Sequence, residues 1–160
     1  MLSCAPRAHA LRAGLLGAIT LAAVGSAVAP ASLATELKGH GGPVRAVAPF
    51  GNGIVTGGFD SAIIEWSITP ALARRVRQHH DSTVNALAPL PGSCFVSGGE
   101  DGRLALWCGT ENTPRQVIVA HKAPVAALAV APDGRQIASA GWDHAVRLWT
   151  LSDRLDPTPR

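Results

Sequence analysis

A ten-residue pattern that occurs three times constrains the fold of this chain more than any other feature. The copies read GGFDSAIIEW at residues 57–66, GGEDGRLALW at 98–107 and AGWDHAVRLW at 140–149. They are spaced 41 and then 42 residues apart (98 − 57 and 140 − 98), and each places an Asp six residues before a Trp. A repeat period of about 40–45 residues is typical of arrays built from one supersecondary unit. We therefore expect three copies of one structural unit.

Short apolar runs make up each unit, and turn-forming residues separate these runs. The first run of each unit begins at Val44, Val84 and Val125, and the later runs end near the repeated Asp and at the repeated Trp. Such β-rich runs between Gly, Pro, Asn and Asp indicate antiparallel hairpins. Residues 73–78 and 115–120 are expected to add a fourth strand to the first two units, whereas the third unit lacks a fourth strand of its own.

Four residue types keep a fixed spacing in every unit. A Thr or Ser lies four residues before the Asp and ten before the Trp, and a His lies four residues before the opening Val. A buried chain of hydrogen bonds from the Trp N–H through the hydroxyl and the His to the Asp would satisfy every donor and acceptor. We interpret these residues as structural tetrads. The three sets are His40, Thr56, Asp60 and Trp66; His80, Ser97, Asp101 and Trp107; and His121, Ser139, Asp143 and Trp149.

On these residues, the three units resemble blades of the WD-repeat β-propeller family. In that family the His of a Gly-His pair, a strand Ser or Thr, a turn Asp and a Trp form such a tetrad. Gly39-His40 keeps the pair, but the Trp-Asp dipeptide is absent, since Ser67, Cys108 and Thr150 follow the three Trp residues. The resemblance implies an all-β fold of four-stranded antiparallel blades. Three blades form an open arc, because closed propellers typically have about four to eight.

The first 34 residues differ in composition from the rest of the chain. They contain no acidic residue, and Arg7 and Arg12 precede an apolar run over residues 13–24. A small-x-small cleavage pattern follows at 32–34, so this segment is predicted to be a secretory signal peptide, with an uncleaved membrane anchor as the alternative. The chain is expected to be exported, to a bacterial periplasm. The predicted parts are the signal peptide 1–34, three blades within 35–151 (about 37–68, 77–108 and 118–151) and a C-terminal tail 152–160.

Three blades leave two interpretations open. Residues 35–38 look like the fourth strand of a blade whose other three strands are missing. The chain is then either a fragment of a longer propeller, without a function of its own, or a homo-oligomer. In the second case two copies joined head to tail would complete a ring of six blades. An open arc would expose apolar faces and an unpaired strand edge.

Charge and motifs exclude several classes of function. The formal net charge is +3, and removal of Arg7 and Arg12 with the signal peptide leaves +1 (3 − 2), so we expect no nucleic-acid binding. No run after the signal peptide is long enough to span a bilayer, so no membrane contact is expected of the mature chain. No metal-ligand spacing, haem attachment motif or nucleophile elbow occurs, so we expect no metal, cofactor or catalytic residue.

The function that remains is a non-catalytic scaffold for protein–protein interaction, with a partner that the sequence does not identify. An alternative is the propeller part of a longer periplasmic redox protein. Some exported chains that resemble this one carry a cytochrome c segment after the propeller, and residues 1–160 contain no such segment.

A candidate partner face comes from the loops that hold the tetrads, which commonly bind partners in the resembling family. Phe59, Glu100 and Trp142 directly precede the three tetrad Asp residues, and Arg45 and Asn85 lie early in the first strands of their units. Exposed aromatic residues and Arg are the usual anchors of interfaces. The alternative is that both aromatic side chains pack against neighbouring turns.

Cys94 and Cys108 face each other if the hairpin turn centres on Asp101, because each lies seven residues from it. Directly opposite Cys pairs are often strained, which favours two buried thiols. The alternative is a cross-strand disulfide, which an oxidising compartment would permit.

Overall fold

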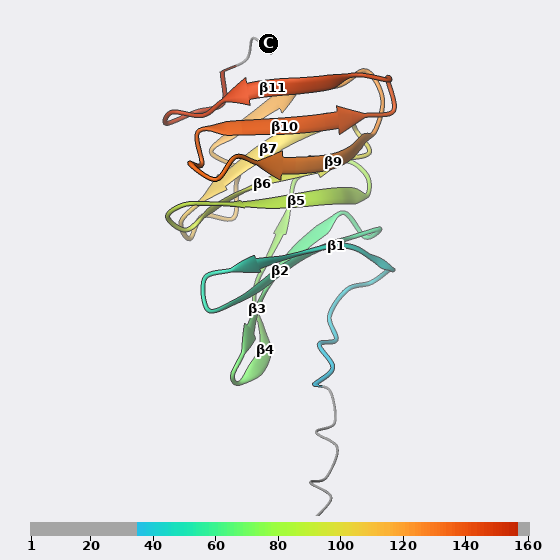
Figure 1. Ribbon diagram of the computed structural model, residues 1–160. Coiled ribbons are helices and arrows are strands. Elements are labelled where there is room, and N and C mark those ends of the chain that lie inside the picture. The colour runs from blue at the N-terminus through green and yellow to red at the C-terminus, as the bar shows by residue number, and fades with distance from the viewer. Residues whose placement is uncertain (1–34, 157–160) are drawn as a thin grey trace, which may run out of the picture. The chain divides into compact units, whose positions relative to one another are not determined.

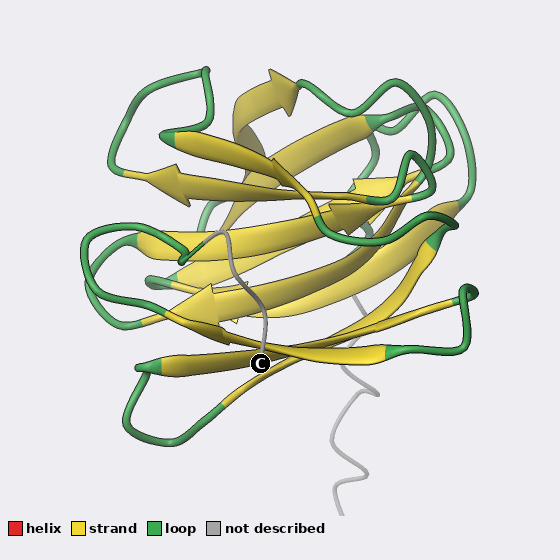
Figure 2. Ribbon diagram, turned by 90° about the horizontal axis from the view of Figure 1, so that it is seen from above, coloured by secondary structure: helices red, strands yellow, loops and turns green. Residues whose placement is uncertain are grey.

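The computed structural model describes residues 35–156, and the predicted signal peptide and the last four residues lie outside this range. This part of the chain holds eleven β-strands and no helix, which confirms the predicted all-β class (Figures 1 and 2). The strands are β1 (Val44–Phe50), β2 (Gly53–Gly58), β3 (Ala62–Ile68), β4 (Ala71–Gln78), β5 (Val84–Leu90), β6 (Cys94–Gly99), β7 (Arg103–Cys108), β8 (Gln116–Val119), β9 (Val125–Val130), β10 (Gln136–Gly141) and β11 (Val146–Thr150).

The strands form three antiparallel sheets, and in each sheet the strands are paired in sequence order. β1–β4 and β5–β8 are four-stranded blades, while β9–β11 form a three-stranded blade. The four-stranded prediction therefore holds for two units, and β4 and β8 are their expected fourth strands. Within residues 35–156 the third blade ends at β11, because the chain turns back there and Leu151 pairs with Leu155.

The three blades follow one another in space in the order of the sequence (Figure 1). In the middle blade β5 lies beside β1 on one side and beside β9 on the other. These first strands are edges of their sheets, which accommodates Pro49 and Pro89 without the loss of a ladder hydrogen bond. The middle blade alone has a described neighbour on both faces, so its strands are the most buried.

Hydrophobic contacts between the blades are organised around a valine and a glycine. Val84 and Val125, which open the second and third blades, are fully buried. A Cβ atom on Gly57 would lie 2.5 Å from Val84 Cγ1, and one on Gly98 would lie 2.6 Å from Val125 Cγ1. The glycine after each of these two tetrad hydroxyl residues therefore forms a socket for the next blade. Burial of each valine stabilises the array by about 1.5–3 kcal/mol.

A buried ion pair lies at the junction of the first and second blades. Arg77 of β4 is 1% exposed, and its Nη1 lies 2.8 Å from Glu65 Oε1, while Arg75 approaches the other carboxylate oxygen of Glu65 at 3.1 Å. The Arg77 guanidinium also stacks 5.3 Å from the Phe95 ring centroid and 5.6 Å from that of Trp107. Burial lowers the pKa of Arg77, and the charge of Glu65 opposes that effect. This Arg joins β4 of the first blade to the core of the second.

Two terminal segments differ from the prediction. Residues 35–38 were expected to resemble a strand, but they belong to none, since no described sheet lies beside them for pairing. Leu37 packs instead against the cluster that contains Trp66. The first part of the predicted tail packs against the blades. Leu155 is 1% exposed, and its backbone N–H and C=O form two hydrogen bonds with the Gln116 side chain.

Candidate functional site

The tetrad of the middle blade forms a continuous buried chain of hydrogen bonds. Trp107 Nε1 donates to Ser97 Oγ at 2.8 Å, and the same hydroxyl lies 2.8 Å from His80 Nε2. His80 Nδ1 then lies 3.1 and 3.0 Å from the two carboxylate oxygens of Asp101. In the tautomer that this network assigns, the His donates to the Asp and accepts from the Ser. The chain of bonds ties β6 and β7 to the loop that precedes β5.

The other two tetrads repeat this geometry with local differences. In the first blade Thr56 takes the place of Ser, and its hydroxyl lies 2.7 Å from both His40 Nε2 and Trp66 Nε1. In the third blade His121 Nδ1 lies 2.8 Å from Asp143 Oδ1. The remaining bonds of the sets are His40 to Asp60 at 2.9 Å, His121 to Ser139 at 2.8 Å and Trp149 to Ser139 at 2.8 Å.

Each tetrad Asp also organises its own turn. Asp101 accepts backbone hydrogen bonds from Arg103 at 3.0 Å and from Asp81 at 3.3 Å. The residue after the Asp adopts a positive φ in all three turns: Ser61 at 58°, Gly102 at 73° and His144 at 62°. Such turns favour glycine, and Gly102 needs it most, because a Cβ there would lie 2.4 Å from the His121 carbonyl oxygen.

The carboxyl groups of these turns are held in the ionised form. Burial raises the pKa of Asp101, but hydrogen bonds from His80 and from two backbone N–H groups outweigh this effect and leave the pKa below its ordinary value. The pKa of Asp60 is lowered in the same way, against the same burial effect, by the Gly41 N–H and by His40. The pKa is lowered most at Asp143, where hydrogen bonds from His121 and Arg147 outweigh the effect of burial, which raises the pKa.

The comparison with family models gives three matches. The family described as "WD domain, G-beta repeat" matches residues 31–67, 73–108 and 112–150, which together are more than half of the chain. The chain belongs to the WD-repeat family. Domains of this family generally act as non-catalytic scaffolds for protein–protein interaction. A search of the curated proteins found no matching sequence.

The residues before the tetrad Asp are presented in the same way in each WD blade. The backbone N–H of Phe59 donates to Pro43 O at 3.0 Å, and Glu100 and Trp142 make the equivalent bonds to Thr83 and Pro124 at 2.9 Å. The Phe59 side chain is 56% exposed and that of Trp142 is 64% exposed. We name the surface formed by these three turns the Asp-turn face, defined by Phe59, Glu100 and Trp142.

The other candidate residues of this face differ in what they contact. Asn85 Nδ2 donates to Val125 O at 3.0 Å, so its amide joins the first strands of two blades. Arg45 is exposed on β1. The Glu100 carboxylate accepts a hydrogen bond from Ser82 at 2.8 Å, and this bond lowers the pKa of Glu100.

Cys94 and Cys108 are disulfide-bonded, with their Cα atoms 4.2 Å apart. They are direct partners in the β6–β7 register, as the turn at Asp101 predicts. The favoured interpretation of two free thiols therefore does not describe this structure. The disulfide packs against the hydrophobic cluster between the second and third blades.

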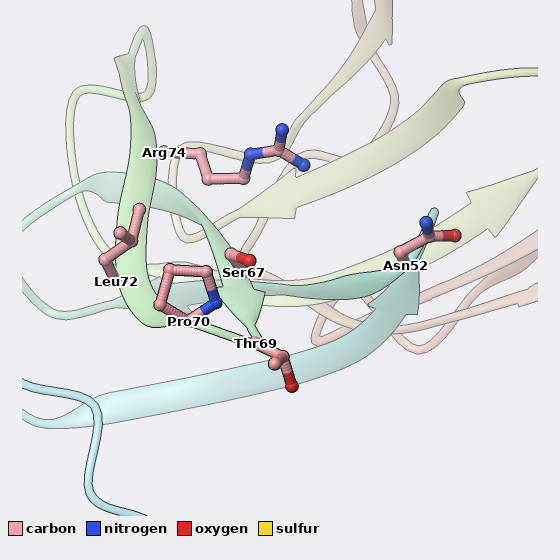
Figure 3. Close-up of a pocket in the computed structure, with 6 residues that line it drawn as sticks. All are labelled: Asn52, Ser67, Thr69, Pro70, Leu72 and Arg74. Atoms are coloured by element: carbon pink, nitrogen blue, oxygen red, sulfur yellow. The ribbon is translucent and has the colours of Figure 1, made fainter.

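Open pockets border the turns of the WD array within residues 35–156. One of about 540 Å³ lies by the β1–β2 and β3–β4 turns, at the strand ends away from the Asp-turn face. The polar ends of Asn52, Thr69 and Arg74 point in different directions there (Figure 3). Among residues 35–156, no three His, Cys, Asp or Glu side chains gather as metal ligands. No helix in that range could cross a bilayer.

Two contacts in the structure were not predicted from the sequence. Arg147 Nη1 donates to Asp143 Oδ2 at 2.8 Å, so a cation supports the Asp of the third tetrad. The sequence signal for this contact is Arg147 itself, because the other units have Ile64 and Ala105 at the equivalent position. The Glu65–Arg77 pair gave a weaker signal, since both residues replace apolar ones of the second unit.

Proposed function

We propose that this chain is an exported, non-catalytic WD-repeat scaffold that binds a protein partner on its Asp-turn face. The observation that carries the proposal is the exposure of Phe59 and Trp142 on turns whose backbones are fixed. Large aromatic side chains on a rigid surface lose little conformational entropy on binding, which makes them effective anchors. The Glu100 carboxylate, on the turn between them in sequence, adds a charge that selects a partner with a cation there.

Rigidity of the face follows from the tetrads. The turn backbones are bonded to the loop before the first strand, and the tetrad Asp holds both segments together through His and backbone N–H groups. A partner would meet a surface that is already organised, so the cost of ordering loops on binding is small. This argument favours a binding platform rather than a moving lid.

Export is supported by two independent features. Residues 1–34 have the sequence of a signal peptide. The Cys94–Cys108 disulfide fits an oxidising compartment such as a periplasm, because thiols stay reduced in the cytosol. Amino-terminal sequencing of the protein from a cell fraction tests this part. A mature chain that begins at Thr35 in the periplasmic fraction is expected, whereas a chain retaining Met1 in the cytosol would contradict export.

The binding role can be tested by site-specific photo-crosslinking in the native host. A photoreactive amino acid at position 142 or 59 is expected to capture one specific protein, which mass spectrometry identifies. The matched control is position 68, because Ile68 is a similarly exposed apolar residue at the other end of the strands. Trp142→Ala should then weaken binding of the purified partner by about tenfold or more, at an unchanged melting temperature. Equal capture at position 68, or a lower melting temperature with unchanged binding, would contradict the proposal.

A further inference from the structure

Residues 35–38 stand in the same relation to the first blade as β4 and β8 do to the second and third. The residue three positions before each tetrad His packs toward the Trp of the blade that follows. Arg77 of β4 stacks on Trp107, and Ile118 of β8 packs against the cluster that contains Trp149. Leu37 occupies this position before His40 and packs against the cluster of Trp66. Residues 35–38 are therefore placed as the fourth strand of a preceding blade.

The third blade presents a strand edge that would accept such a strand. In the first two blades the third strand pairs with β4 or β8, whereas residues 35–156 supply no strand for the outer edge of Val146–Leu148. The returning chain reaches only the end of β11, where Asp156 N donates to Thr150 O at 3.0 Å. Val146 and Leu148 are 69% and 47% exposed.

We propose that a second copy of this chain fills this edge, with its residues 35–38 paired antiparallel to β11 and its first blade packed on the third. The register follows from the middle blade, where Leu104 faces Ile118 and Ala105 faces Val117. Moved to the third blade, this register sets Leu37 of the second copy opposite Val146 and Glu36 opposite Arg147. The proposal is independent of the partner-binding role of the Asp-turn face.

Charge supports this register. Glu36 and Arg147 carry opposite charges, and opposite charges on directly facing strand positions stabilise a pair. Arg147 already pairs with Asp143 at 2.8 Å, so its guanidinium would be shared between the two carboxylates. Among residues 35–156 of the single chain, Glu36 pairs only with Lys38, at 3.1 Å, and both side chains are about three-quarters exposed or more. That contact is weak and is readily exchanged.

The two open faces also match in shape. The first blade exposes Val44, the equivalent of the buried Val84 and Val125, beside a pocket of about 440 Å³ that Ile54 and Trp66 help to line. The equivalent surface of the second blade receives Ala48, Val55 and Ile63 of the first. In the third blade the matching positions are Ala129, Ala138 and Val146, which are equally apolar and no larger. A second copy can therefore approach as the blades within one chain do.

One residue makes the interface between copies different from the internal ones. Ala140 occupies the position of the socket glycines Gly57 and Gly98, so Val44 of a second copy would meet an added methyl group. Ala138, which replaces the larger Val55 and Val96, leaves space beside it. We expect Val44 to shift toward Ala138 and the contact between copies to be weaker than the internal ones. Two such contacts would join the six blades of two copies of residues 35–156 in a ring.

The test measures association of the purified chain by sedimentation velocity and light scattering over a range of concentrations. A reversible dimer is expected. Val146→Asp should abolish it, while Val119→Asp should not, because Val119 is 77% exposed on β8 but lies outside the proposed contact. A chain that stays monomeric at its highest soluble concentration would overturn the proposal. So would equal effects of the two Asp variants, which would indicate nonspecific association of apolar surface.

Ala140→Gly separates association from folding. The variant should lower the dimer dissociation constant about tenfold, because Val44 could then sit as Val84 and Val125 do. The same change should make the folded monomer slightly less stable, since glycine is unfavourable within a strand. The two effects have opposite signs, so they are distinguishable in one series of measurements. An unchanged or larger dissociation constant would show that the copies do not meet at this position.

Discussion

Removal of one hydroxyl from the middle blade is expected to destabilise the fold strongly. In Ser97→Ala the Trp107 N–H and the His80 Nε2 atom both lose their partner. Ser97 and Trp107 are fully buried and His80 is nearly so, so water cannot replace the lost oxygen. A buried group left unpaired costs about 1–3 kcal/mol, and two such groups give a loss of about 2–6 kcal/mol. That is a large part of the stability of a typical domain.

The matched variant is Thr56→Val, which removes the equivalent hydroxyl of the first blade and nearly keeps its shape. Thr56, His40 and Trp66 help to line the pocket on the open face of that blade, so solvent lies closer to their polar atoms than in the middle blade. We expect this variant to cost about half as much. Urea unfolding followed by circular dichroism measures both free energies of unfolding. Equal losses, or a loss below about 0.5 kcal/mol in Ser97→Ala, would refute the argument from burial.

A double-mutant cycle isolates the Trp–Ser bond. Trp107→Phe removes the indole N–H, so Ser97→Ala in that background should leave only the His80 nitrogen unpaired. The two changes should therefore cost about 1–2 kcal/mol less together than their sum. Strict additivity would mean that this hydrogen bond contributes nothing beyond packing.

Three further variants or conditions test other features. Gly102→Ala should lower the free energy of unfolding by about 2–4 kcal/mol. Gly92 has a similar φ and nothing within 4 Å of its Cβ position, so Gly92→Ala should lower the free energy of unfolding by only about 1–2 kcal/mol. Similar losses in urea unfolding would exclude a clash between the added Cβ and the His121 carbonyl oxygen. The Cys94–Cys108 disulfide closes a loop with a sequence separation of 14, so its reduction should lower the free energy of unfolding by about 2–3 kcal/mol. This loss should appear as a lower urea midpoint under reducing conditions. An unchanged midpoint would show that the disulfide does not stabilise the fold. Because the folded-state pKa of Asp101 is lowered from its ordinary value, its stabilising effect is fully present above that ordinary value and is lost as the pH falls through the folded pKa. Asp101→Asn should therefore flatten the acid limb of the stability profile.

The spacing of the repeats made the tetrads predictable. A hydrogen-bonded set that recurs at a fixed interval leaves the same residue types at the same positions, so the sequence displays it three times. The Cys94–Cys108 pairing followed from the turn at Asp101, because a hairpin register depends on local geometry alone. Whether the facing sulfur atoms are bonded depends on the backbone separation, and the sequence pattern does not contain that quantity.

The contacts that were not predicted are those that do not repeat. Glu65 and Arg77 replace Leu106 and Ile118 of the second unit, so the averaged pattern hides a pair that forms at one junction. Burial of Leu155 depends on Gln116, which is 39 residues away, and the sequence offers no periodic signal for it. Long-range contacts of this kind are decided by packing.

Packing also distributes stability unevenly along the array. In a linear array each blade contributes its own stability plus a term for each neighbour, and the middle blade has two neighbours where the others have one. The fully buried side chains of β6 and β7, such as Phe95, Leu104 and Trp107, reflect this. Docking of a second copy would give the first and third blades a second neighbour as well. Amide exchange in β1 and β11 should then slow as the protein concentration rises, while exchange in β6 and β7 depends on concentration less. Exchange in β1 and β11 that does not respond to concentration would instead mean that the outer faces stay open.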